Sequence, residues 1–139
     1  MNEADQLYPI CNIYHIKKKQ LKEYVPPQTD KNKILCIDFK RIDTWEVYAE
    51  IVEKALEFPR PIKGSPNRFL DWITDLSWYE YERYDLFFFN FKHLACKNLI
   101  DANEIYCEFE ETILPFWRYE VIHTVVDGKP KDFNVYFVE

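Results

Sequence analysis

The sequence predicts an α/β domain with a small three-stranded parallel sheet packed against helices. Three short runs of β-branched and aromatic residues lie far apart in the chain, near residues 34–39, 84–91 and 133–138. The segments between them carry apolar residues at helical spacing. Strands that alternate with helices favour a parallel sheet with right-handed crossovers. A chain of 139 residues fits one such domain.

The first strand and the first long helix are expected between residues 33 and 58. The run at 34–39 is of the kind that lies inside a parallel sheet. Asp43 can then cap a helix, with Glu46 three residues later completing a box-like cap. The helix should end before Phe58-Pro59. Its apolar side chains recur at helical spacing, and they are Trp45, Tyr48, Ile51, Val52, Ala55 and Leu56.

A loop and a short second helix should follow, before the second strand. Residues 60–64 are typical of a loop, Ser65 can be the N-cap, and Pro66 the first helical residue. This helix should reach about residue 76 and turn four apolar side chains inward, those of Phe69, Trp72, Ile73 and Leu76. The run at 84–91 is largely apolar on both faces, as a central strand should be.

The last third of the chain predicts helical structure and a final strand. Apolar positions between Asp101 and Val126 fit helical spacing, although Pro115 must break, kink or restart the helix. Asp127-Gly128 supplies a stop, and residues 133–138 form the last strand.

Residues 1–32 are expected to form an N-terminal extension to a domain at 33–139. Residues 8–16 can be extended, and Lys17-Lys18-Lys19 and the turn-prone Pro26-Pro27 follow them. We interpret this part as an appendage or an edge strand, not as a second domain.

Charge and composition favour a cytoplasmic protein that binds another protein. The formal charge of −6 and the pI near 5.1 argue against a nucleic-acid binder, because phosphate neutralisation needs a basic surface. No apolar run approaches the ~20 residues that cross a bilayer. Residues 1–5 lack the basic and apolar regions of a signal peptide.

Little in the sequence points to catalysis, and we expect no enzyme, no cofactor and no metal. Only two glycines are present, which excludes a Gly-rich phosphate loop. The four cysteines contain no Cys-x-x-Cys pair, so we expect reduced and mostly buried thiols without a disulfide. His93 and Cys96 have faintly metal-like spacing, which chance explains better. A Cys/His nucleophile that forms in space stays open.

Carboxylate pairs offer a second candidate chemistry in the last third of the chain. Glu104 with Glu108, and Glu110 with Glu111, are spaced for acid-base work, but a solvated helix face is the preferred interpretation.

The most informative feature is a concentration of acidic residues. Asp71, Asp75, Glu80, Glu82 and Asp85 lie within fifteen residues, with Arg83 as the one basic interruption. Asp71 and Asp75 are four apart and share one helix face, where like charges repel, so a binding role would explain them. Trp78 stands beside these acids, and aromatic side chains commonly anchor protein interfaces.

These residues resemble the barstar family of small ribonuclease inhibitors. The resemblance rests on the order of elements over residues 33–139, on the step at Phe58-Pro59, and on the stretch 70–75, which reads Leu-Asp-Trp-Ile-Thr-Asp. It implies that acids of the second helix reach into a nuclease's basic, phosphate-binding site.

Two registers of that resemblance are possible. Without gaps, Asp71 takes the later family acid, Asn67 the earlier one and Pro61 a loop tyrosine; with a four-residue loop insertion, Asp71 and Asp75 match both acids. The loop departs from the family because it lacks a Tyr-Tyr-Gly run and carries extra basic residues, which are Arg60, Lys63 and Arg68. The candidate partner-binding residues are Asp71, Asp75, Trp78, Asn67, Glu80 and Ile62.

The resemblance implies an immunity protein that binds and inhibits a cognate toxin, a nuclease by expectation. Acidic and aromatic side chains would block the toxin's active site, and electrostatic steering would speed capture. The alternatives are a barstar-like interaction module without a toxin partner, and a small hydrolase that uses scattered cysteines and histidines.

Overall fold

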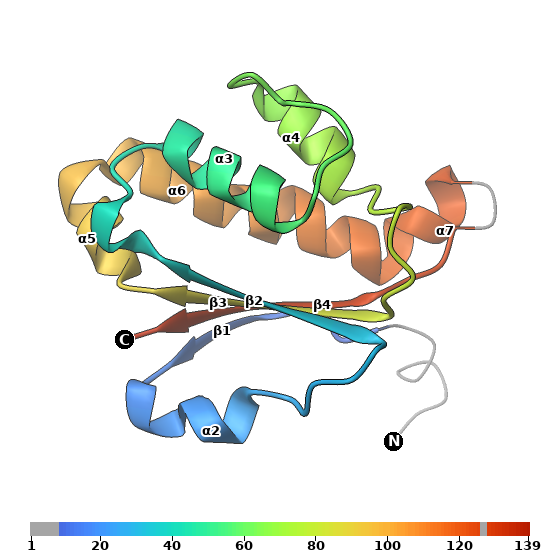
Figure 1. The fold of residues 1–139 in the computed structure, drawn as a ribbon, viewed down its shortest axis with the longest axis horizontal. Coiled ribbons are helices and arrows are strands. Elements are labelled where there is room, and N and C mark those ends of the chain that lie inside the picture. Colours follow the sequence, from blue (N-terminus) through green and yellow to red (C-terminus); the bar gives the residue numbers. More distant parts are fainter. Residues whose placement is uncertain (1–8, 126–127) are drawn as a thin grey trace.

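The computed structural model describes residues 9–125 and 128–139 and shows four parallel strands in the order β1-β4-β3-β2 (Figure 1). The strands are β1 (Ile13–Ile16), β2 (Asn32–Asp38), β3 (Arg83–Phe89) and β4 (Asp132–Val138). The α/β class is therefore correct. The prediction of three strands is wrong, because β1 pairs with β4 along its whole length.

The added strand comes from the N-terminal part of the chain, which was expected to be an appendage or an edge strand, and β1 lies at the edge of the sheet. Side chains near the start of β4 hold the segment that leads into β1: the Ile10 N–H donates to Asp132 Oδ1 and the Asn12 N–H to Asn134 Oδ1, both at 2.9 Å. Ile16 is the last residue of β1, and its side chain is buried. The expected start of the extended segment at Tyr8, residues 1–5, and the helix stop at Val126 and Asp127 lie outside the described residues.

Helices cover the two faces of the sheet unequally (Figure 1). One face carries α3 (Trp45–Ala55), α4 (Pro66–Ile73), α5 (Phe91–Lys97), α6 (Leu99–Cys107) and α7 (Val121–Thr124), and the other carries α2 (Leu21–Tyr24) after the short η1 (Lys18–Gln20). A large core lies under the first group and a small one, around Phe87 and Tyr136, under α2. β3 and β4 are consequently buried on both faces, as central parallel strands are.

The two helices that precede β3 begin close to the predicted places. Thr44, not Asp43, caps α3, since its Oγ1 accepts from the Val47 N–H at 3.2 Å. Ser65 caps α4 as predicted, with its Oγ accepting from the Arg68 N–H at 3.2 Å. α4 ends at Ile73, three residues earlier than expected, and Leu76 follows with a left-handed φ of 52°.

The second predicted strand, residues 84–91, extends two residues too far, because β3 ends at Phe89, before Asn90. Asn90 takes a left-handed conformation with φ 59°, which asparagine tolerates better than most residues, and Phe91 starts α5. Its amide Nδ2 donates to Asp38 Oδ1 at 2.8 Å, which ties the ends of β3 and β2 together. The apolar Phe91 thus belongs to a helix and not to the strand.

The helical segment from residue 99 to residue 124 continues through Pro115. Two π-helical stretches, η3 (Glu108–Ile113) and η4 (Phe116–Glu120), stand on either side of this proline. A proline lacks an N–H and its ring meets the carbonyl four residues back. In a π-turn the hydrogen bonds join residues five apart, which widens the helix. The wider turns tolerate the missing N–H and the bulky ring, so the helix is not interrupted at Pro115.

A buried polar group sits in the small core beneath the sheet. The Asp85 carboxylate, fully buried, accepts from Arg83 Nε at 2.7 Å, from Arg83 Nη2 at 3.1 Å and from the Tyr136 hydroxyl at 2.7 Å. Burial and the Asp85 carboxylate raise the pKa of Tyr136 above its ordinary value. Asp85 therefore does not belong to the exposed acidic cluster in which the sequence placed it.

Tyr136→Phe should lower the free energy of unfolding by about 1–2 kcal/mol, because Asp85 then loses one donor in a buried place. Urea unfolding followed by circular dichroism measures the change. Tyr14→Phe is the matched control, since Tyr14 stacks on Tyr136 and, within the part of the chain that the structure describes, its hydroxyl accepts a hydrogen bond only from the exposed Asn12 amide. Equal stabilities of wild type and Tyr136→Phe would contradict the role given to this hydroxyl.

Candidate protein-binding surface

The loop between α3 and α4 is anchored to the core at one residue. Ile62 is 1% exposed, and its N–H donates to Glu53 Oε1 on α3 at 2.6 Å. Lys63 and Gly64 then take left-handed φ values of 50° and 72°, which turn the chain toward the start of α4. Glycine adopts such a conformation without strain. The anchor holds the turn against α3, and the neighbouring side chains of Pro61 and Lys63 are exposed.

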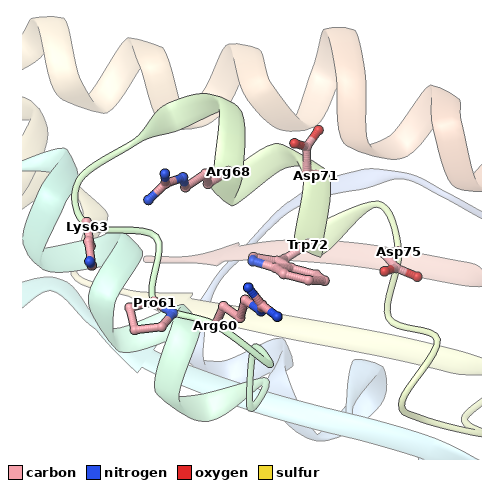
Figure 2. A pocket seen from close by; sticks show the side chains of 7 residues that line it. All are labelled: Arg60, Pro61, Lys63, Arg68, Asp71, Trp72 and Asp75. Carbon is pink, nitrogen blue, oxygen red and sulfur yellow. The ribbon is translucent and has the colours of Figure 1, made fainter.

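An open pocket of about 530 Å³ lies between this loop and α4 (Figure 2). It is lined by Arg60, Pro61, Lys63, Arg68, Asp71, Trp72 and Asp75, which we call the α4–loop surface. In Figure 2 Lys63 and Arg68 lie on one side, Asp71 and Asp75 lie on the other, and the Arg60 side chain lies beside Trp72 between them. The surface therefore presents charges of both signs around one tryptophan.

The five charged side chains of the α4–loop surface form no ion pair with any residue in 9–125 or 128–139. Within the same residues, the Asp75 carboxylate accepts one hydrogen bond, from the Ser77 N–H at 3.2 Å. Exposed charges that are not neutralised within the chain remain available to complementary charges of a partner.

Trp72 supplies an apolar contact in the middle of these charges. It is half-buried, packs edge-on against Trp78 with 5.7 Å between ring centroids, and lines the pocket. Its indole N–H donates to no described residue, whereas Trp78 Nε1 donates to the Leu56 carbonyl at 2.9 Å. Both tryptophans are half-buried, and Trp72 is the one that lines the pocket.

The structure brings together only part of the predicted set of partner-binding residues. Asp71 and Asp75 line the pocket side by side with Trp72, which the sequence had assigned to the core. Asn67 and Glu80 are exposed but lie outside the lining, and Ile62 is buried. The lining also includes four residues of the loop and the first turn of α4, which are Arg60, Pro61, Lys63 and Arg68. The sequence showed that three of them are basic but did not assign them to the partner-binding set.

Within 9–125 and 128–139, the residues of the other candidate chemistries do not come together in one place. His93 Nε2 lies 3.1 Å from Asp43 Oδ1 and does not pair with Cys96, and among the described residues no group of three metal-ligating side chains converges. All four cysteines are free, but only Cys11 is buried, so the expectation of mostly buried thiols is wrong. Burial raises the pKa of Cys11 to about 11, which leaves its thiol protonated at neutral pH.

Glu108 contradicts the expectation of a solvated acidic helix face. It is 5% exposed, its Oε1 accepts from Trp45 Nε1 at 2.7 Å, and its Oε2 has no partner among the described residues. Burial raises the pKa of Glu108 to about 7, against the lowering effect of the Trp45 hydrogen bond. Glu104, Glu110 and Glu111 are exposed.

Comparisons with known proteins identify the fold and no family. No family model and no curated protein matches the chain. Among solved structures it is similar to the ORC2 protein of Aeropyrum pernix in ADPNP–ADP complexes, with a TM-score of 0.62 and 12% sequence identity. The match covers 96% of this chain and 36% of that one, so this chain spans about a third of its length. Among the described residues, none of the helices combines the length and the apolar character that crossing a bilayer requires.

Proposed function

We propose that this chain is an inhibitor that binds a toxin protein, a nuclease, through the α4–loop surface. The observation that carries the proposal is a pair of carboxylates, Asp71 and Asp75, that form no ion pair with a described residue and lie with the half-buried Trp72 on an anchored, concave surface. Charged and aromatic side chains of this kind give a protein interface its affinity and its specificity.

The surface carries both kinds of charge that could complement a nuclease active site. Such a site binds phosphates through arginine and lysine side chains, which the carboxylates of Asp71 and Asp75 would meet. It also carries glutamate or aspartate side chains as general acids and bases, which the basic side chains of Arg60, Lys63 and Arg68 would meet. A ligand that satisfies both kinds of group fills the site and excludes the substrate.

The resemblance to the barstar family supports the same surface. The register with a four-residue loop insertion places the two inhibitory acids at Asp71 and Asp75, and both line the pocket. The gap-free register uses Asn67, which lies outside the lining. We therefore propose the register with the insertion.

The second candidate is an interaction module without a toxin partner. The three basic side chains favour it, because a strongly cationic nuclease site would repel them. A partner of mixed charge that is not a nuclease would suit the whole surface.

A nuclease assay with the protein encoded in the neighbouring reading frame separates the two candidates. Equimolar wild type should abolish cleavage of RNA or DNA, and Asp71→Ala/Asp75→Ala should restore most of it. Glu110→Ala/Glu111→Ala, which removes two exposed carboxylates elsewhere, should inhibit as wild type does. Stoichiometric binding without inhibition would instead indicate the interaction module, and inhibition by the Asp71/Asp75 double variant equal to that of wild type would contradict the proposed surface.

A further inference from the structure

A second pocket, of about 260 Å³, lies at the carboxyl edge of the sheet and shares no lining residue with the α4–loop surface. Its walls come from four elements: His15 on β1, Phe91 on α5, Tyr106 on α6 and Phe137 on β4. Lys18 on η1 and Lys92 on α5 also border it. We call this the carboxyl-edge pocket.

The topology of the sheet explains why a pocket opens there. After β1 the chain passes to the face that carries α2, and after β3 it passes to the opposite face, into α5 (Figure 1). β4 lies between these two strands. The segments that leave β1 and β3 therefore diverge above and below the end of β4. Ligands of open α/β sheets bind in crevices of this kind, outside the carboxyl ends of the strands.

The walls are suited to a flat ring. The His15 ring stacks on Phe137 with 5.3 Å between centroids and 17° between planes, and it lies nearly parallel to Tyr106. Phe91 meets Phe137 edge-on at 4.8 Å. Aromatic rings bind another planar ring by offset stacking and by edge-to-face contact. The wall rings make both contacts with one another, and all four line the pocket, so a planar ligand meets an aromatic wall.

The carboxyl edge of the sheet is basic although the chain is acidic, and Lys18, Lys92 and Glu139 line the pocket itself. The segments at the carboxyl ends of the strands, 17–20, 38–42, 90–92 and 139, hold two acidic residues, Asp38 and Glu139. The six basic residues of the same segments are Lys17, Lys18, Lys19, Lys40, Arg41 and Lys92. Asp38 already accepts from Asn90 Nδ2 and from the Lys40 N–H, and Glu139 lies 3.6 Å from Lys92. The Lys18 ammonium forms no ion pair with any described residue.

From these observations we propose that the carboxyl-edge pocket binds a small aromatic acid, a planar ring that carries one anionic group. The ring lies against His15, Phe91 and Phe137, and the anionic group faces Lys18 and Lys92 at the rim. The pocket volume is below the roughly 300 Å³ at which ligand sites of ordinary size begin, so the ligand has one or two fused rings. This function is additional to the binding of a protein partner on the α4–loop surface.

Titration with 2-naphthoate, followed by backbone NMR shifts of the full chain, tests the proposal. Saturable shifts should appear at 15–18, 91–95 and 137–139 and not at 60–75. The neutral 2-naphthamide and inorganic phosphate should each bind about tenfold more weakly or worse, because one lacks the charge and the other lacks the ring. Raising the salt concentration should weaken 2-naphthoate binding, because it screens exposed charges.

Variants locate the site. Lys18→Gln/Lys92→Gln should weaken 2-naphthoate about tenfold, whereas Lys22→Gln/Lys97→Gln, with the same charge change outside the pocket, should change it less than twofold. Ala95→Leu should block binding by filling the pocket. Glu139→Gln should strengthen 2-naphthoate binding, because it removes the carboxylate that competes for Lys92.

Three results would each overturn the proposal. They are the absence of saturable shifts with 2-naphthoate, an equal affinity for 2-naphthamide, and equal losses of affinity in the two lysine double variants.

Discussion

Asp71→Ala should weaken the complex with the cognate toxin by about 10²-fold. Asp71 is exposed on α4, lines the pocket and forms no ion pair with a described residue, so its carboxylate is free to meet a cation of the partner. Truncating one member of a charge pair that becomes buried on binding leaves the other charge without compensation, which costs about 3–5 kcal/mol. A loss of about 10²-fold lies near the lower end of that range.

Titration calorimetry on wild type, Asp71→Ala and Asn67→Ala measures this effect. Asn67 is exposed on the same helix but outside the pocket, so Asn67→Ala should bind as wild type does. The melting temperature of free Asp71→Ala should stay within about 2 °C of wild type, as expected for an exposed side chain that forms no ion pair with a described residue. Equal affinities of Asp71→Ala and wild type would remove Asp71 from the interface, and a large fall in melting temperature would make it a structural residue.

Glu108 should make the protein lose stability as pH rises from about 4.5 to about 8. The folded pKa of Glu108, about 7, lies above its ordinary value of 4.5 because the carboxyl is buried. The raised pKa means that the folded state holds the proton more tightly, so the stabilisation is complete below pH 4.5 and is lost as pH passes through 7. A shift of this size corresponds to about 3 kcal/mol.

Glu108→Gln should flatten this pH dependence and stabilise the protein by about 1–2 kcal/mol at pH 8, since the amide oxygen still accepts from Trp45 Nε1. Glu110→Gln, exposed in the same π-helical stretch, is the control and should leave the pH dependence unchanged. Urea unfolding between pH 5 and pH 8 is the measurement. In that interval Asp38, whose pKa is lowered by hydrogen bonds from Asn90 and the Lys40 N–H, stays ionised. A pH profile of Glu108→Gln identical to that of wild type would contradict the assignment.

The sequence predicted β2, β3 and β4 as strands and left the segment of β1 as either an appendage or an edge strand. β3 and β4 are recognisable because long apolar runs mark interior strands that are buried on both faces, and the edge strand β2 carries a shorter run of the same kind. β1 has four residues, with one exposed histidine among them, and three lysines follow it. Its place depends on Asp132 and Asn134, which receive the N–H groups of Ile10 and Asn12 from 122 residues away. No local pattern carries that information.

The predicted ends of helices and strands were wrong where the backbone departs from regular geometry. The left-handed Asn90 separates β3 from α5 within one apolar run, so the composition of residues 84–91 did not show the boundary. Pro115 signals a break in an α-helix, but π-turns on both sides let the helix continue. Propensity describes regular elements and carries little information on such local exceptions.

The candidate surface was half visible in the sequence. The four-residue spacing of Asp71 and Asp75 placed both on one helix face, and both line the pocket. Trp72 was assigned to the core because it follows the helical pattern, yet it stands at the edge of the apolar face and is half-buried. Ile62 lay in the loop and proved to be its buried anchor. Trp72 packs against Trp78, which lies outside α4. The spacing of apolar residues within the helix does not show this contact, so it could not predict how exposed Trp72 is.

Amide hydrogen exchange of this chain, free and bound to the cognate toxin, tests the central claim most directly. The account predicts slower exchange on binding in residues 60–78, which comprise the loop, α4 and the segment with Trp78, and unchanged exchange around the carboxyl-edge pocket at 15–18 and 90–95. Protection confined to the face under α2 or to the carboxyl edge, with residues 60–78 unchanged, would contradict the α4–loop surface as the binding site.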